Sequence, residues 1–148
     1  MSTIAAIEDA MLAALREKLP GLEVATLPGP PEEALRRTMR MPAVWVVWTG
    51  ERPEGAPQRH GSGLKRTFIQ TFEVVVVTRN LRSQKEGARG AYELIDAVLD
   101  ALLGLRVLGT TGFLNYAGTR LFEIEAGVFV YFCTFEVQTA ITANAKEG

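Results

Sequence analysis

A chain of 148 residues with 47% hydrophobic and 22% charged residues has the size and composition of one globular domain, so we predict a single domain over residues 1–148. One cysteine excludes an internal disulfide, and the absence of a long apolar run or a signal-peptide pattern argues against a membrane partner. The net charge of −1 conceals a segregation, because residues 1–35 carry −4, residues 36–89 carry +7 and residues 90–148 carry −4. A basic middle between acidic ends indicates contact with copies of itself or with a polyanion, and a solvated face without a partner is the alternative.

The N-terminal part predicts a helix, a short strand and a stiff connector. A helix over residues 3–19 follows from one apolar stripe with spacings of three and four, formed by Ile4, Ile7, Met11, Leu15 and Leu19. The dipeptide Pro20-Gly21 ends this helix, and residues 22–27 are expected to form a short strand. Residues 28–31 contain three prolines, which fix φ and remove donors, and residues 32–39 are expected to form a helical turn.

The middle of the chain predicts two strands separated by a long loop. Residues 41–49 form a strand that is apolar on both faces and places Trp45 and Trp48 on opposite sides. One tryptophan can pack in the core, whereas the other needs a helix or a neighbouring subunit over it. Residues 50–64 contain four glycines and two prolines and predict a flexible loop, after which residues 65–79 form the next strand.

A second helix is predicted over residues 83–103. Ser83 and Glu86 form the S-x-x-E capping box that is typical of a helix start. The apolar face of this helix is formed by Ala88, Tyr92, Ile95, Val98, Leu99 and Leu102. Gly104 suits the left-handed residue that often ends a helix.

Two strands complete the predicted fold. They cover residues 119–125 and 128–142, follow a glycine-rich connection at residues 109–118, and precede a frayed tail at residues 143–148. The element order is α-β-β-β-α-β-β. We therefore predict an α+β fold with a single mixed, mainly antiparallel sheet of about five strands and two helices packed on one face.

The sequence offers little for catalysis. His60 and Ser62 are neighbours, but glycines flank the serine directly, and a loop leads into a strand instead of the strand-to-helix turn of a nucleophile elbow. Cys133 lies mid-strand among aromatic residues and reads as core. Three glutamates alternate with apolar residues on the last two strands: Glu123, Glu125 and Glu136. This pattern fits the exposed face of a sheet, and the alternative is a pair of carboxylates for acid–base chemistry. We expect no cofactor, no metal and no enzyme activity. The alternative is a small cytoplasmic enzyme in which residues 50–64 form a lid.

Candidate interface residues come from the basic middle and from the two tryptophans. Nucleic-acid binders usually interleave exposed aromatic residues with basic ones. Here the aromatic residues lie on strands, where their side chains are expected to be buried in the core. We therefore expect no sequence-specific nucleic-acid binding. The candidates for a protein–protein interface are Arg36, Arg37, Arg79, Arg82, Lys85, Trp45 and Trp48.

Five segments together resemble a family of Mu-like phage and prophage tail proteins. They are IAAIEDAM at residues 4–11, MPAVWV at 41–46, VVVTRNLR at 75–82, GAYELIDAV at 90–98 and FEVQT at 135–139. The resemblance covers nearly the whole chain in order, and its motifs are structural. It transfers no catalytic residue.

The resemblance implies a structural subunit of a contractile phage or prophage tail. Proteins of this kind are similar to tail terminators, which form a ring, usually a hexamer, on the last ring of the tail tube and prepare the tail to join the head. The implied partners are copies of the chain itself, tail tube and sheath proteins, and head-completion or neck proteins. The implied location is the host cytoplasm during assembly and then the virion tail, and another neck or minor tail protein is the alternative.

Overall fold

The computed structural model of the protein describes residues 3–27, 42–79, 84–107, 110–125 and 127–146. Within these ranges two helices accompany one sheet. The helices are α1 (Thr3–Lys18) and α3 (Gln84–Leu102), and the strands are β1 (Glu23–Thr26), β2 (Ala43–Pro53), β3 (Gln58–His60), β4 (Gly63–Arg79), β5 (Asn115–Glu125) and β6 (Val128–Ala143). The helical turn expected at residues 32–39 and the capping residue Ser83 fall outside the described residues.

The strands form one mixed sheet in the order β1-β2-β4-β6-β5, with β3 also paired to β4. Only the short β1–β2 pair is parallel among the described strand pairs, and the others are antiparallel. The predicted α+β class and the mainly antiparallel sheet are confirmed. The sheet has six strands instead of about five, because β3 forms within the segment that was expected to be a loop.

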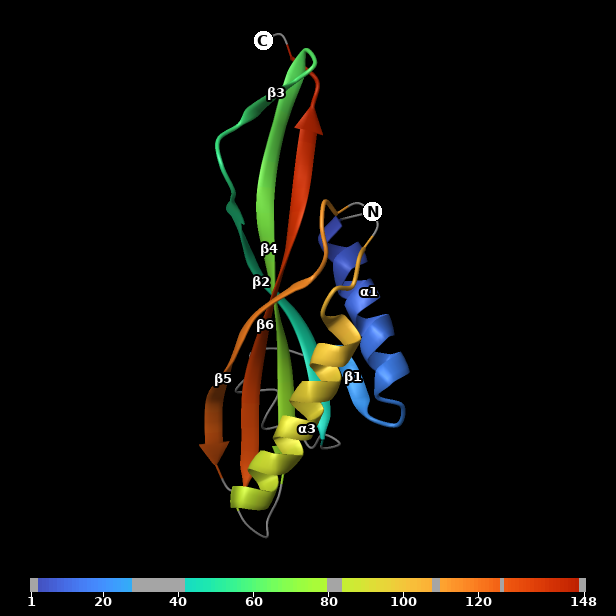
Figure 1. Cartoon of the computed structure of the whole chain (residues 1–148), viewed down its shortest axis with the longest axis vertical. Coiled ribbons are helices and arrows are strands. Elements are labelled where there is room, and N and C mark those ends of the chain that lie inside the picture. The colour runs from blue at the N-terminus through green and yellow to red at the C-terminus, as the bar shows by residue number, and fades with distance from the viewer. Residues whose placement is uncertain (1–2, 28–41, 80–83, 108–109, 126, 147–148) are drawn as a thin grey trace.

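Both helices pack on the same face of the sheet, as predicted (Figure 1). The stripe on α1 places Ile7, Met11 and Leu15 in the core at 0% exposure. They share one core cluster with alternate residues of β4 such as Phe72 and Val74, which lie on one face because side chains two apart share a face of a strand. Gly104 follows α3 with a φ of 80°, which confirms it as the left-handed residue beyond the helix end.

A smaller apolar cluster lies on the opposite face of the sheet. It consists of Ala43, Trp45, Val75, Val77, Val130 and Phe132. Ala25, Leu27, Val47 and Val128 pack against it and are partly buried. The strands β2, β4 and β6 are therefore covered on both faces over part of their length, which explains their continuous apolar runs.

The sheet is much longer than the helices that cover it. With 17 residues β4 spans roughly 56 Å, whereas α1 with 16 residues spans only about 24 Å. Figure 1 shows the helices beside one half of the sheet and strands alone in the other half. We call this projecting part the arm and define it as residues 51–70 and 137–143.

The arm corrects the prediction of a loop over residues 50–64. β2 continues to Pro53 after a register shift between Trp48 and Gly50, and Gln58–His60 pair with Gly63–Lys65 around the turn. The long β4 supplies backbone partners to this segment whatever its side chains are. Pro53 is tolerated because this part of β2 is a sheet edge, since β1 pairs only with residues 43–46. Only residues 54–57 lack strand structure between β2 and β3.

The start of β5 is a second correction. The strand begins at Asn115, within the expected glycine-rich connection, and not at Thr119. Its register against β6 shifts between Tyr116 and Gly118, and Gly118 has a φ of 134°. A β-bulge at this glycine therefore lets the strand continue where the sequence predicted an irregular segment.

Candidate assembly surfaces

The basic interface candidates lie where the structure describes them only in part. Arg79 is the last residue of β4 and is exposed. Lys85 lies in the first turn of α3, of which the backbone is described. Arg36, Arg37 and Arg82 fall outside the described residues.

The two tryptophans have different environments, although they lie three residues apart on β2. Trp45 is opposite Val75, faces away from the helices and is 1% exposed. Trp48 is opposite Phe72, shares the helix-side face and remains 38% exposed. Trp45 therefore belongs to the core of the chain, and Trp48 is the tryptophan with surface available to a partner.

A buried polar network anchors the root of the arm. Gln70 is 3% exposed, and its Oε1 accepts a hydrogen bond of 2.9 Å from Nε1 of Trp48. Its Nε2 donates to Oε2 of Glu51 at 2.6 Å and to Oγ1 of Thr139 at 3.1 Å. The amide thus joins β2, β4 and β6 with both of its amide hydrogens in use, so it fixes the orientation of the arm relative to the helix-covered half.

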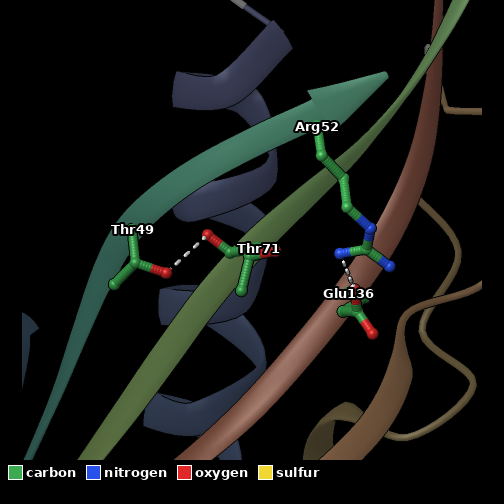
Figure 2. Close-up of polar contacts among 4 residues, drawn as sticks. All are labelled: Thr49, Arg52, Thr71 and Glu136. Carbon is green, nitrogen blue, oxygen red and sulfur yellow. Dashed lines mark hydrogen bonds and ion pairs between the residues drawn. The ribbon is translucent and has the colours of Figure 1, made fainter. Parts of the chain in front are cut away.

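Polar contacts also cross the opposite face of the sheet near the root of the arm (Figure 2). Nη1 of Arg52 on β2 donates to Oε2 of Glu136 on β6 at 2.5 Å and passes over the intervening strand β4. Oγ1 of Thr49 donates to the backbone oxygen of Thr71 at 3.3 Å. The Arg52 side chain is 60% exposed, so its ion pair contributes little to the free energy of unfolding.

Farther from the arm, the same face carries an aromatic and charged band. Glu73 is 7% exposed, accepts a hydrogen bond of 2.8 Å from Thr134 and lies 3.7 Å from Nη1 of Arg120. The guanidinium of Arg120 lies 4.9 Å from the ring centroid of Phe132, which stacks on Phe122 at 4.7 Å. These contacts tie β4, β6 and β5 together, and they leave Phe122 at 43% exposure on the edge strand.

The residues considered for catalysis are not brought together. His60 and Ser62 are exposed at the tip of the arm. Glu123 pairs with Val130, six residues along β6 from Glu136, which separates their backbones by roughly 20 Å and excludes a carboxylate pair.

The single cysteine is a core residue. Cys133 is 0% exposed, and burial raises the pKa of its thiol. A raised pKa lowers the thiolate fraction, which is the reactive form, so this residue is inert packing as predicted.

Two further findings bear on the kind of site. No group of three or more His, Cys, Asp or Glu side chains that could hold a metal ion occurs among the described residues. Neither α1 nor α3, the helices of the described ranges, is long and apolar enough to cross a membrane.

Comparison with known proteins places the chain in a family. The family model for the phage tail terminator protein matches residues 2–146. The chain belongs to the phage tail terminator family. The family match and the Mu-like prophage relative described next together confirm the resemblance to Mu-like phage tail proteins.

Two relatives agree with this assignment. The chain is 31% identical over 111 residues to the Mu-like prophage FluMu protein gp37 of Haemophilus influenzae, a match that covers 72% of this chain and 53% of the relative. The chain thus spans about half the length of this curated relative. It shares its fold with a chain in the virion of a native gene transfer agent particle, with a TM-score of 0.59, 18% identity, and coverage of 94% of this chain and 98% of that one.

Sequence reasoning did not find Gln70 and Glu73 as anchoring residues. Both interrupt the apolar strand β4 with a polar side chain, which was the available signal. The partners of Gln70 lie between 19 and 69 positions away in the chain, and Thr134 lies 61 positions from Glu73. A polar residue in a strand predicts a partner, but the sequence does not say which one.

Proposed function

We propose that this chain is the tail terminator of a contractile phage or prophage tail and acts as a structural subunit, not as an enzyme. Its copies form a ring, expected to be hexameric, on the end of the tail tube, where the ring meets tube and sheath proteins and the head-completion or neck proteins. Assembly takes place in the host cytoplasm, and the ring remains in the virion tail. The family match over residues 2–146 is the observation that carries the proposal.

The surface of the chain supports self-association. Among the described residues, large apolar side chains are exposed on β2, on the arm, on or just after α3, and on or just before the edge strand β5: Trp48, Leu64, Tyr92, Leu103, Phe113, Leu121, Phe122 and Ile141. A cyclic ring uses heterologous interfaces, so each subunit needs two different and complementary patches. A rigid sheet that presents separate exposed apolar groups meets this requirement.

The basic segment that contains Arg79, Arg82 and Lys85, between the end of β4 and the start of α3, is part of the proposed interface. Reversing Arg79, Arg82 and Lys85 to glutamate is expected to abolish ring formation on tails while the monomer stays folded, because the reversal introduces like-charge repulsion at the contact. Electron microscopy of tails reports the ring, and circular dichroism reports the fold.

The matched control for this triple reversal changes a charge of the same sign elsewhere. Reversal of Arg106, an exposed arginine that lies outside the basic segment, should leave ring formation near the wild-type level. A triple reversal of Arg79, Arg82 and Lys85 that assembles as wild type would remove the basic segment from the interface. Rings that form at another position on the particle would instead favour a neck or minor tail protein.

A further inference from the structure

We propose that the tip of the arm in one copy docks onto the outer face of α3 in a second copy. The inference rests on the self-association in the proposed function and specifies which surfaces meet. Two patches on the chain carry it, and they are complementary in both charge and apolar character.

The first patch, the arm patch, lies at the tip of the arm on the helix-side face. Leu64 pairs with Arg59 on β3, and Arg66 pairs with Ile141 on β6. Directly paired residues of antiparallel strands share a face, and positions 64 and 66 are two apart on β4, so these four side chains lie together. Leu64 is 50% exposed and Ile141 is 56% exposed, since the helices do not extend over the tip.

The tip of the arm is positively charged. Its residues 58–66 and 141–146 contain four basic side chains and no acidic one: Arg59, Lys65, Arg66 and Lys146. The nearest acidic residue of the arm, Glu54, lies closer to the root, beside Thr67. Exposed apolar groups framed by arginines are typical of a surface that meets an acidic partner with apolar groups of its own, because the rim charges steer the encounter and the apolar groups supply affinity.

The second patch, the α3 patch, has the opposite charge. Residues 90–104 contain three acidic side chains and no basic one, and these lie on one side of α3 at spacings of three and four: Glu93, Asp96 and Asp100. All three are exposed. Asp100 lies 3.9 Å from Nζ of Lys18. Beside them Tyr92 is 54% exposed and Leu103 is 57% exposed.

The two patches of one copy cannot meet each other. Figure 1 places the tip of the arm at one end of the long axis and α3 beside the other half of the sheet. Each patch therefore needs a second molecule. Contact between unlike patches is heterologous and passes from copy to copy, as a closed ring requires.

A charge-swap experiment tests the docking. The arm variant Arg59→Glu, Arg66→Glu has two acidic patches, and the α3 variant Glu93→Lys, Asp96→Lys has two basic patches. Each variant alone is expected to associate at least about tenfold more weakly than wild type in sedimentation velocity at low salt, since like charges face each other. An equimolar mixture should recover wild-type association, because alternating copies then present opposite charges at every contact.

The control and the contrary outcomes separate this inference from the proposed function. Asp9→Lys, Glu17→Lys on α1 matches the charge change of the α3 variant and should associate as wild type. A mixture that fails to recover, or an arm variant that associates normally, overturns the docking while wild-type rings on tails still stand. An arm variant that loses only binding to duplex DNA or to tail tubes assigns the arm to that partner and also overturns the docking. Wild-type copies that never form rings on tails overturn the proposed function itself.

Discussion

Replacing Trp45 with alanine is expected to lower the free energy of unfolding by about 3–5 kcal/mol. Trp45 is 1% exposed and packs with Val75, Val77 and Val130 on the face of the sheet away from the helices. Its indole N–H has no hydrogen-bond partner in the described part of the chain, so the loss comes from packing and the cavity that alanine leaves. Denaturant unfolding followed by circular dichroism measures the change.

Trp48→Ala is the matched control, since it removes the same side chain from the same strand. It is expected to cost less than Trp45→Ala, about 2 kcal/mol, from partial burial and from the acceptor left without a partner on the buried Gln70. Trp45→Phe should cost less than Trp45→Ala because most of the apolar volume is kept. Equal losses at the two tryptophans would contradict the division into a core and a surface residue.

Gly63→Ala is expected to separate the end of β6 from the start of β4 at the tip of the arm, while the core stays folded. A Cβ at this position would lie 1.9 Å from the backbone oxygen of Ala143, at the point where β4 begins and β6 ends. A backbone atom cannot move aside as a flexible side chain can, so the two strand ends must part. Hydrogen exchange should show lost protection at residues 63–66 and 140–143 and unchanged protection at residues 72–77.

Gly90→Ala is the control for this glycine change. Nothing lies within 4 Å of a Cβ at Gly90, which is in α3, so alanine there should stabilise the chain by up to about 1 kcal/mol. Global loss of protection in Gly63→Ala would show that the arm and the core unfold together. Retained protection at the tip would show that the β4 and β6 ends are not held as closely as the structure describes.

The sequence predicted the helix-covered half of the fold and the arm strands β4 and β6 well, and residues 51–60 of the arm poorly. The stripe Ile7, Met11 and Leu15 identified α1 because its apolar side chains are the ones the sheet buries. Residues 51–60 give no such signal, since their side chains are exposed on both faces of the sheet and need no alternating apolar pattern. Backbone pairing to a long neighbour decides the structure there, and a neighbour is not visible in a local pattern.

The candidate surfaces show the same division. The sequence placed Trp45 and Trp48 on opposite faces from their spacing alone. It could not say which face the rest of the chain covers, because that depends on where distant segments pack. Likewise the basic side chains Arg59 and Arg66 were part of a charge count, and only the register of β3 and β4 places them beside exposed apolar groups.

The most direct test of the proposed terminator role is cryo-electron microscopy of tails from the phage or prophage that encodes this chain, with and without its gene. The proposal predicts one ring of this protein at the head-proximal end of the tube in complemented particles. Without the gene, it predicts tails that lack the ring and do not join heads. Tails that join heads normally without the gene, or copies of the protein at another position in the particle, would contradict it.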